Sequence, residues 1–426
     1  MKEKGVAFVI SHMVGLGTAI PYVRALEAEG RTVRVYCLGD FQEIASELLP
    51  GTEVVPLGVL RLPRRLSRVV AKLQYGLSSF DPGLNSTSRQ QFEHRSSLGS
   101  RARKSVLSAT RRFKAKTINR ISRRVFATFL KIPSISEREI WVVSFLLEPL
   151  IAITKGARVC TLMDSWDHPV RRVAGYETDV VIGWNRPLAE DWIEYQGGQH
   201  AVVGAPLRLQ YAAEAYPLAP CANQTLMYAV GTSSHSGPWE TGELRLAELV
   251  CDAASDAGWE VVLKLKPTGG QDAWRALGAR YAHVSFTEER EALGPMHFYL
   301  DPTYNAGRLE ALRNVACVVN AVTTFGLDAA CAGVPVLQLA GLHGPGLAGI
   351  AAAQKNYHLQ RYLLSDPDLV FEVEEAQLRC DLAAWLADPD QRAVRYAATL
   401  RGWIVGDDDI DLAVRHATGR AMYLLA

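Results

Sequence analysis

Short apolar runs, each followed by a helical pattern, repeat along most of the chain. The first run spans residues 6–11, a glycine-bearing turn is expected over residues 12–19, an amphipathic helix over 20–30, and the next strand over 32–39. These runs are continuous rather than alternating, as in parallel strands that are covered on both faces. Strands that alternate with helices in this way predict an α/β fold with parallel sheets.

A second series of the same kind follows a Pro-rich segment, residues 217–220, which we interpret as a linker. A chain of 426 residues is also too long for one ordinary hydrophobic core. We therefore predict two Rossmann-like, doubly wound domains, residues 1–216 and residues 217–390, followed by C-terminal helices in residues 391–426. The first of these domains carries a basic helical insertion near residues 61–131.

Residues 318–339 predict a strand, a polar turn, a helix and a second strand. Thr323 and Thr324 interrupt the first strand, and a hydroxyl here is placed to cap a helix that begins at Phe325. The free N–H groups of such a helix start bind anions, usually a diphosphate in an open α/β sheet. Asp328, one turn later, is a candidate to accept a hydrogen bond from a ribose hydroxyl. The alternative is purely structural, because every doubly wound fold contains such units.

Two lysines and two serines follow neighbouring strands of the second series. Lys264 and Lys266 alternate with apolar residues at the end of a strand, so both point to one face near its carboxyl edge. We expect one or both to contact phosphate, and a solvated strand end is the alternative. Ser233 and Ser234 follow the strand TLMYAVG at the matching edge, where they are further candidates to contact the same ligand.

Composition narrows the class of protein. Hydrophobic residues make up 48% and charged residues 21%, which are values of globular proteins, and the net charge of +1 argues against a general preference for nucleic acid. The seven cysteines form no metal-binding spacing, so we expect reduced thiols, a cytoplasmic protein and no metal site. The longest apolar candidate, residues 140–154, is too short to span a membrane.

The stretch from Arg89 to Arg124 is strongly basic. Twelve of its residues are Lys or Arg and Glu93 is its only acid, while apolar residues run through it. Docking on an anionic membrane surface is one interpretation, since cations attract anionic lipid and apolar side chains insert. Binding to RNA or DNA is less favoured because aromatic residues are sparse. An insertion that binds nothing remains the alternative.

Several blocks resemble one family in order and spacing. MDSWDHPVRR, DVVIGWNRPLAEDWIEYQG and AVVGAP are followed by TLMYAVGTSS, VVLKLKP and VVNAVTTFGLDAACAGVPVL, which together cover most of residues 140–340. This pattern resembles GT-B fold proteins of bacterial surface-carbohydrate biosynthesis, and it is loosely shared with CDP-glycerol glycerophosphotransferases and capsule-type Kdo transferases. The resemblance implies two Rossmann-like domains facing a cleft, with the nucleotide donor in the second domain.

What the resemblance implies for function is a glycosyltransferase without a cofactor. It would move a sugar from a nucleotide-sugar donor to a surface glycan or a lipid-linked acceptor. One departure matters, because Lys266 and Pro267 stand where these families carry His-Pro, and a lysine cannot do imidazole chemistry at neutral pH. Two alternatives therefore stay open, namely a CDP-glycerol-type polyol-phosphate transferase and a non-catalytic GT-B scaffold that binds nucleotide or glycan.

Transfer to a hydroxyl group by inversion needs a base on the acceptor side. Asp164 and His168 follow the strand VCTLM, at the carboxyl edge that would face the cleft. His12 ends the first strand directly before the expected glycine-bearing turn, and it is the competing candidate. For each residue the alternative is structural, because Asp164 is placed to cap a turn and His168 merely precedes a proline.

Overall fold

The computed structural model divides into two compact units. Unit 1 comprises Met1–Leu207 and Ile410–Ala426, and unit 2 comprises Arg208–Asp409. The structure describes residues 5–10, 13–37, 41–56, 135, 137, 139–143, 157–163, 178–196, 198–205, 207–214, 216–218, 223–231, 238–265, 271–287, 300, 302–356, 363–405 and 410–425.

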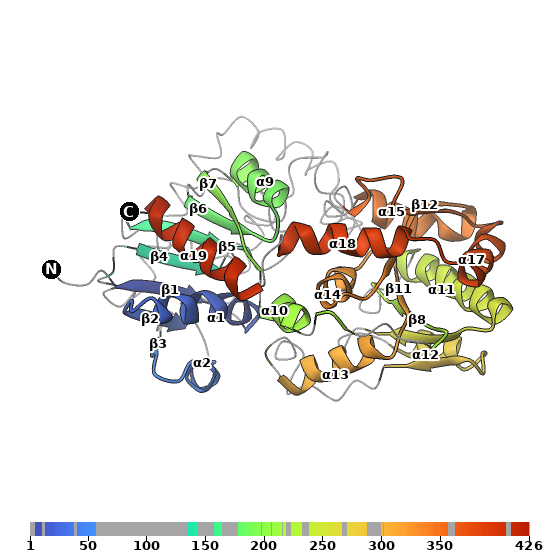
Figure 1. Cartoon of the computed structure of the whole chain (residues 1–426), viewed down its shortest axis with the longest axis horizontal. Coiled ribbons are helices and arrows are strands. Elements are labelled where there is room, and N and C mark those ends of the chain that lie inside the picture. Colours follow the sequence, from blue (N-terminus) through green and yellow to red (C-terminus); the bar gives the residue numbers. More distant parts are fainter. Residues whose placement is uncertain are drawn as a thin grey trace, which may run out of the picture. The chain divides into compact units, whose positions relative to one another are not determined.

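The described strands of unit 1 form a seven-stranded sheet in the order β3-β2-β1-β4-β5-β6-β7 (Figure 1). All neighbouring strands in this sheet are parallel. The order reverses between β1 and β4, which is the mark of a doubly wound sheet. The elements of the unit are β1 (Val6–Ile10), α1 (Met13–Ala28), β2 (Val33–Cys37), α2 (Gln42–Leu48), β3 (Glu53–Pro56), β4 (Glu139–Val143), β5 (Arg158–Leu162), β6 (Thr178–Gly183), α9 (Arg186–Gln196), β7 (Gly198–Val203) and α19 (Ile410–Leu425).

Helix α1 begins at Met13, so the glycine-bearing turn expected over residues 12–19 is wrong. Gly17 and Pro21 lie inside this helix, although glycine and proline both disfavour helix interiors. Every residue from 15 to 23 is buried. The helix packs against β1, β2, β4 and α19. Tertiary burial therefore outweighs the local propensities of these residues.

The last two helices belong to different units. Helix α18 (Arg392–Ile404) packs on α14 and β12 of unit 2, whereas α19 packs on α1 and strands β5, β6 and β7 of unit 1. The inner face of α19 carries buried residues at helical spacing, which are Val414, Ala417, Ala421 and Leu425. The sequence predicts one helical segment over residues 391–426 and a domain boundary after residue 216. The structure divides the chain after Leu207 and returns α19 to the first unit.

The described strands of unit 2 form a six-stranded parallel sheet in the order β10-β9-β8-β11-β12-β13. The prediction of two Rossmann-like, doubly wound units is confirmed. The elements are α10 (Leu207–Glu214), β8 (Thr225–Ala229), α11 (Pro238–Ala257), β9 (Glu260–Lys264), α12 (Asp272–Gly278), β10 (Val284–Phe286), α13 (Pro302–Arg313), β11 (Cys317–Asn320), α14 (Phe325–Ala332), β12 (Val336–His343), a 3-10 turn η1 (Pro345–Leu347), α15 (Ala348–Asn356), β13 (Phe371–Glu374), α17 (Leu378–Ala387) and α18.

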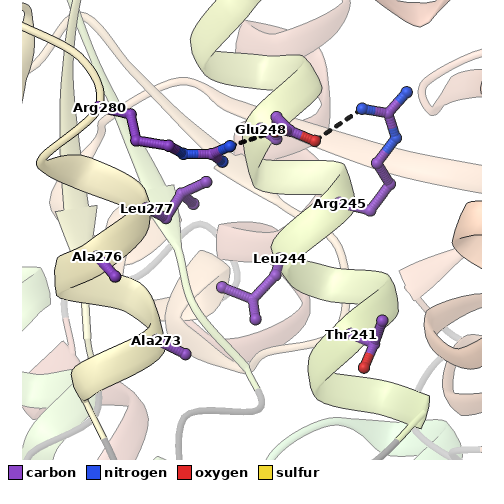
Figure 2. Close-up of a pocket in the computed structure, with 8 residues that line it drawn as sticks. All are labelled: Thr241, Leu244, Arg245, Glu248, Ala273, Ala276, Leu277 and Arg280. Carbon is purple, nitrogen blue, oxygen red and sulfur yellow. Dashed lines mark hydrogen bonds and ion pairs between the residues drawn. The ribbon is translucent and has the colours of Figure 1, made fainter.

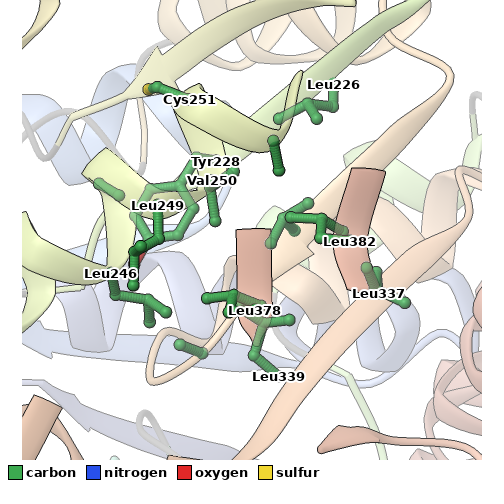
Figure 3. Close-up of a cluster of buried hydrophobic side chains, with 14 of the residues drawn as sticks. Leu226, Tyr228, Leu246, Leu249, Val250, Cys251, Leu337, Leu339, Leu378 and Leu382 are labelled. Carbon is green, nitrogen blue, oxygen red and sulfur yellow. The ribbon is translucent and has the colours of Figure 1, made fainter. Parts of the chain in front are cut away.

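One face of this second sheet carries a large apolar core. Figure 3 shows its centre, where α11 and α17 meet strands β8 and β12. The labelled side chains there include Leu246, Val250, Leu339, Leu378 and Leu382, and each is at most 1% exposed. Helix α12 adds Trp274 to the same cluster, with no exposed surface. This core fixes the strands whose carboxyl ends form the site described below.

No helix in the described ranges is long and apolar enough to cross a bilayer. The basic stretch from Arg89 to Arg124, with its predicted contact to a membrane surface, lies outside the described residues.

Cysteine reactivity provides a test of this packing. Of the six described cysteines, Cys380 is exposed and the others are buried. Burial raises the pKa of the Cys37, Cys251 and Cys317 thiols to about 12. A maleimide at pH 8 should therefore modify Cys380 of the native protein and reach the buried thiols only after unfolding, because the thiolate is the nucleophile. A Cys221→Ser background removes the cysteine outside the described residues, and mass spectrometry then counts the labels. Rapid labelling of Cys317 in the native state would contradict the described burial.

Candidate functional site

The order of strands in unit 2 reverses between β8 and β11. From β8 the chain proceeds outward to β9 and β10, and from β11 it proceeds the other way to β12 and β13. The two central strands run parallel, with Ala229 of β8 beside Asn320 of β11. Ligands of open α/β sheets bind outside the carboxyl ends of the strands at such a switch point. The segments that follow Ala229 and Asn320 are therefore the candidate site.

These two segments approach each other closely at Gly231. A Cβ atom at Gly231 would lie 2.6 Å from Cγ2 of Val322, so only glycine fits there without a shift. The backbone N–H of Gly231 donates to Oε1 of Glu243 at 2.6 Å, and Glu243 of α11 has no exposed surface. Burial, together with the Glu243 carboxylate, raises the pKa of Tyr228 in β8 well above its usual value. Glu243 thus fixes the backbone where β8 ends.

Helix α14 starts directly after the turn over residues 321–324. Oγ1 of Thr323 accepts a hydrogen bond from the Phe325 N–H at 3.3 Å. Thr324, which precedes the helix, makes no side-chain cap hydrogen bond, so the hydroxyl that caps the helix is that of Thr323. The helix ends at Gly333, whose φ of 85° lies in the left-handed region. A threonine hydroxyl at the start and a left-handed glycine at the end therefore delimit the helix.

Buried amide side chains fix the turn over residues 321–324 by hydrogen bonds. Nε2 of Gln338 donates to the Ala321 carbonyl at 3.0 Å, and Nε2 of Gln354 donates to the same oxygen at 3.1 Å. Oε1 of Gln338 accepts from Nδ2 of Asn320 at 2.6 Å. Gly326 lies against this amide, since a Cβ there would be 3.1 Å from Nδ2 of Asn320. The turn is thus preorganised by hydrogen bonds inside the fold before any ligand binds.

Two cations flank the first residue of helix α14. Nζ of Lys264 lies 5.6 Å from the centre of the Phe325 ring, and Cζ of Arg308 lies 5.4 Å from it. Lys264 is 7% exposed, and its ammonium donates to the Leu265 carbonyl at 2.8 Å. Cations over an aromatic face are attracted by the ring quadrupole. Two cations and the free N–H groups of the helix therefore lie together at its start, which favours binding of an anion.

Asp328 lies in an ion pair at the same place. Its Oδ1 is 2.6 Å from a guanidinium nitrogen of Arg308, and both side chains are at most 10% exposed. Arg308 also donates to Oδ1 of Asn305 at 3.2 Å. A hydrogen bond from a ribose hydroxyl to Asp328, as the sequence analysis expected, would have to share the carboxylate with Arg308.

The structure brings five of the predicted site residues together and leaves the others undescribed. Lys264, Thr323, Thr324, Phe325 and Asp328 gather around the start of α14. The remaining predicted site residues lie outside the described residues, and they are His12, Asp164, His168, Ser233, Ser234 and Lys266.

Sequence reasoning missed Glu243 and Arg308, although each leaves a signal. Glu243 shares the apolar stripe of α11 with Leu246 and Val250, at spacings of three and seven residues. Arg308 lies on the inner face of α13 with the buried residue Leu312, one turn away. A charged residue in an apolar stripe indicates a buried polar contact, because an unpaired charge is costly to bury.

A separate groove lies between α11 and α12 (Figure 2). It has a volume of about 390 Å³ and an apolar floor that includes Leu244 and Leu277. At one end Glu248 is held by two arginines, Arg245 at 2.7 Å and Arg280 at 2.8 Å. The hydrogen bond from Arg245 lowers the pKa of Glu248. Of the predicted site residues that the structure describes, none lines this groove.

Solved structures match the chain over nearly its whole length, whereas no protein-family model and no curated protein sequence matches it. A protein from Listeria monocytogenes described as a UDP-N-acetylglucosamine 2-epimerase is 12% identical with a TM-score of 0.52, over 99% of this chain and 95% of that one. UDP-GlcNAc 2-epimerase from Neisseria meningitidis, bound to UDP-GlcNAc, is 10% identical with a TM-score of 0.50, over 99% of both chains. MurG from Acinetobacter baumannii is 12% identical with a TM-score of 0.49, over 98% of this chain and 99% of that one.

These matches concern the fold. The two doubly wound parallel sheets and the alignment over nearly the whole chain show a two-domain α/β fold of the GT-B type.

Proposed function

We propose that this protein is a GT-B glycosyltransferase that moves a sugar from a nucleotide-sugar donor to a surface glycan or a lipid-linked acceptor. The turn over residues 321–324 is the single observation that supports this most. Two buried glutamines, Gln338 and Gln354, hold it so that α14 starts at the switch point of the sheet, between two cations. A rigid helix start with positive charge beside it fits a nucleoside diphosphate.

In this scheme the donor diphosphate binds the N–H groups at the start of α14, beside Thr323, Thr324 and Phe325. Lys264 adds positive charge from the end of β9. Further donor contacts are proposed for Lys266, Ser233 and Ser234. As the bond to the sugar breaks, negative charge grows on the departing phosphate. The cations and the helix dipole then stabilise the transition state more than the ground state, which accelerates the reaction.

The acceptor side of the proposal comes from the sequence. Asp164, His168 or His12 of unit 1 would take the proton of the attacking hydroxyl, a role that contributes on the order of a hundredfold to ten-thousandfold in rate. An acceptor attached to lipid would bring the protein to the inner face of the cell membrane. The basic stretch from Arg89 to Arg124 is proposed to make that contact.

A thermal-shift series tests the donor class. UDP, GDP, dTDP, CDP and CMP are added separately, and a ligand at a hundred times its dissociation constant should add about 2.7 kcal/mol of stability. We expect stabilisation by a nucleoside diphosphate, followed by sugar transfer from the matching nucleotide sugar. Stabilisation by CMP alone, together with release of CMP as the reaction product, would indicate a Kdo-type transferase or a polyol-phosphate transferase. Binding without any product would indicate a scaffold, and conversion of the sugar without an acceptor would indicate an epimerase.

The hydroxyl of Thr324 provides a residue-level prediction. Thr324→Val preserves the shape but removes a hydroxyl from the proposed phosphate site. It should weaken binding of UDP, or of whichever diphosphate the series selects, by roughly 1–3 kcal/mol. The variant should still fold, because valine keeps the branched shape of threonine. Calorimetric titration measures the change, and Thr399→Val, an exposed threonine of α18 that bonds only to its own helix, is the matched control. Equal affinities in wild type and Thr324→Val would place the phosphate elsewhere.

A further inference from the structure

Arg308 lies in helix α13, outside every segment in which the sequence placed a site residue. Its guanidinium is 10% exposed, pairs with Asp328 at 2.6 Å, and lies 5.4 Å from the centre of the Phe325 ring. We propose that Arg308 is a positioning residue that neutralises Asp328 and thereby makes the start of α14 selective for a nucleoside diphosphate. The proposal rests on the function proposed above, because it assigns the ligand of that same site.

The reason is electrostatic. Asp328 lies in the first turn of α14, close to the positive end of the helix dipole. A carboxylate favours that end just as a phosphate does, so an unpaired Asp328 would oppose a polyanionic ligand there. Burial makes this repulsion stronger than in water, since charges interact more strongly at low dielectric constant. Arg308 cancels the carboxylate through its ion pair.

The balance of charge around Phe325 then decides which ligand fits. Among the described residues at this ring, two cations, Lys264 and Arg308, face one carboxylate, Asp328. Loss of Arg308 leaves the Asp328 carboxylate without the guanidinium that neutralises it. The loss of affinity should therefore grow with the charge of the ligand, from an uncharged nucleoside through a monophosphate to a diphosphate. If Arg308 only packed the helix in place, its loss would lower the affinity for all three ligands by the same factor.

The test compares calorimetric titrations of uridine, UMP and UDP, or of the corresponding series for the base that the thermal shifts select. In Arg308→Met we expect UDP to bind about tenfold more weakly or worse, which is the effect of one unit charge about 10 Å away at an effective dielectric constant near 20. The affinity for UMP should fall less, and the affinity for uridine should hardly change. Arg308→Lys should recover most of the UDP affinity, because it restores the charge. The double variant Arg308→Met, Asp328→Asn should recover it as well.

Arg379→Met is the matched control. Arg379 pairs with Asp256 through two hydrogen bonds of 2.6 and 2.7 Å on the surface of the same unit. The control should leave the whole nucleotide series unchanged.

Two results would overturn the role of Arg308. One is an equal loss of uridine, UMP and UDP in Arg308→Met, which would show a purely structural contribution. The other comes from Asp328→Asn, which replaces Arg308→Met as the test variant if Arg308→Met fails to fold. It should retain or tighten UDP binding, and an equal loss of uridine and UDP would show that Asp328 contacts the ribose directly. Failure of the wild type to bind any nucleotide would instead refute the proposed function, so the two failures are distinguishable.

Discussion

Gln338→Leu should lower the free energy of unfolding of unit 2 by roughly 2–4 kcal/mol. Gln338 is fully buried, and its amide bonds to the Ala321 carbonyl, to the Leu339 carbonyl and to the Asn320 side chain. Leucine preserves the volume approximately but leaves the Asn320 amide without the acceptor that Gln338 provides. A buried polar group without a partner costs about 1–3 kcal/mol, to which the lost hydrogen bonds add.

The same substitution should also loosen the turn over residues 321–324. Nucleotide affinity should then fall even under conditions where the variant is fully folded, since the N–H groups of α14 are no longer held in place. Urea unfolding measures the stability, and calorimetry at low temperature measures the affinity. Gln391→Leu is the control, because Gln391 is exposed and makes no side-chain cap hydrogen bond. An unchanged urea midpoint for Gln338→Leu would show that the amide network contributes nothing to the fold.

Trp274→Ala should have the largest effect on stability, a loss of roughly 3–5 kcal/mol. Trp274 is fully buried in the apolar core between α12 and the sheet, so truncation leaves a cavity that the surrounding strands cannot fill. For a unit of this size the midpoint of thermal unfolding should fall by about 2–4 °C for each kcal/mol.

Arg275→Ala is the matched control for this substitution, because Arg275 is the next residue of the same helix and its side chain is exposed. Differential scanning calorimetry of the two variants should separate them by more than 5 °C, which is about the smallest shift that the expected loss allows. A Trp274→Ala protein that melts with the wild type would mean that α12 does not pack on the core as described.

Much of the fold follows from local sequence. The continuous apolar runs around Val319 and Leu337 predict buried parallel strands because such strands are covered on both faces. The helix between them is delimited by local chemistry as well. A threonine hydroxyl accepts the first free N–H, and Gly333 adopts the left-handed conformation that ends the helix. Each of these signals acts within a few residues, so a sequence pattern is sufficient to detect it.

Local signals failed where distant packing decided the outcome. Gly15 and Gly17 are typical of a turn, yet they lie inside α1, because burial of this segment outweighs helix propensity. The tail predicted to form one segment separates into α18 on unit 2 and α19 on unit 1. Both faces of a sheet need cover, and the sequence does not specify which helix covers which face.

The chemistry of the site divides in the same way. Periodicity and capping are local, so a pattern in the sequence predicts both series of strands and helices and a helix that starts at Phe325. Folding, in contrast, brings Arg308 to Asp328, twenty residues away, and brings Gln354 to the Ala321 carbonyl, 33 residues away. Such contacts depend on how helices cross the sheet, which is fixed by burial of side chains distant in sequence.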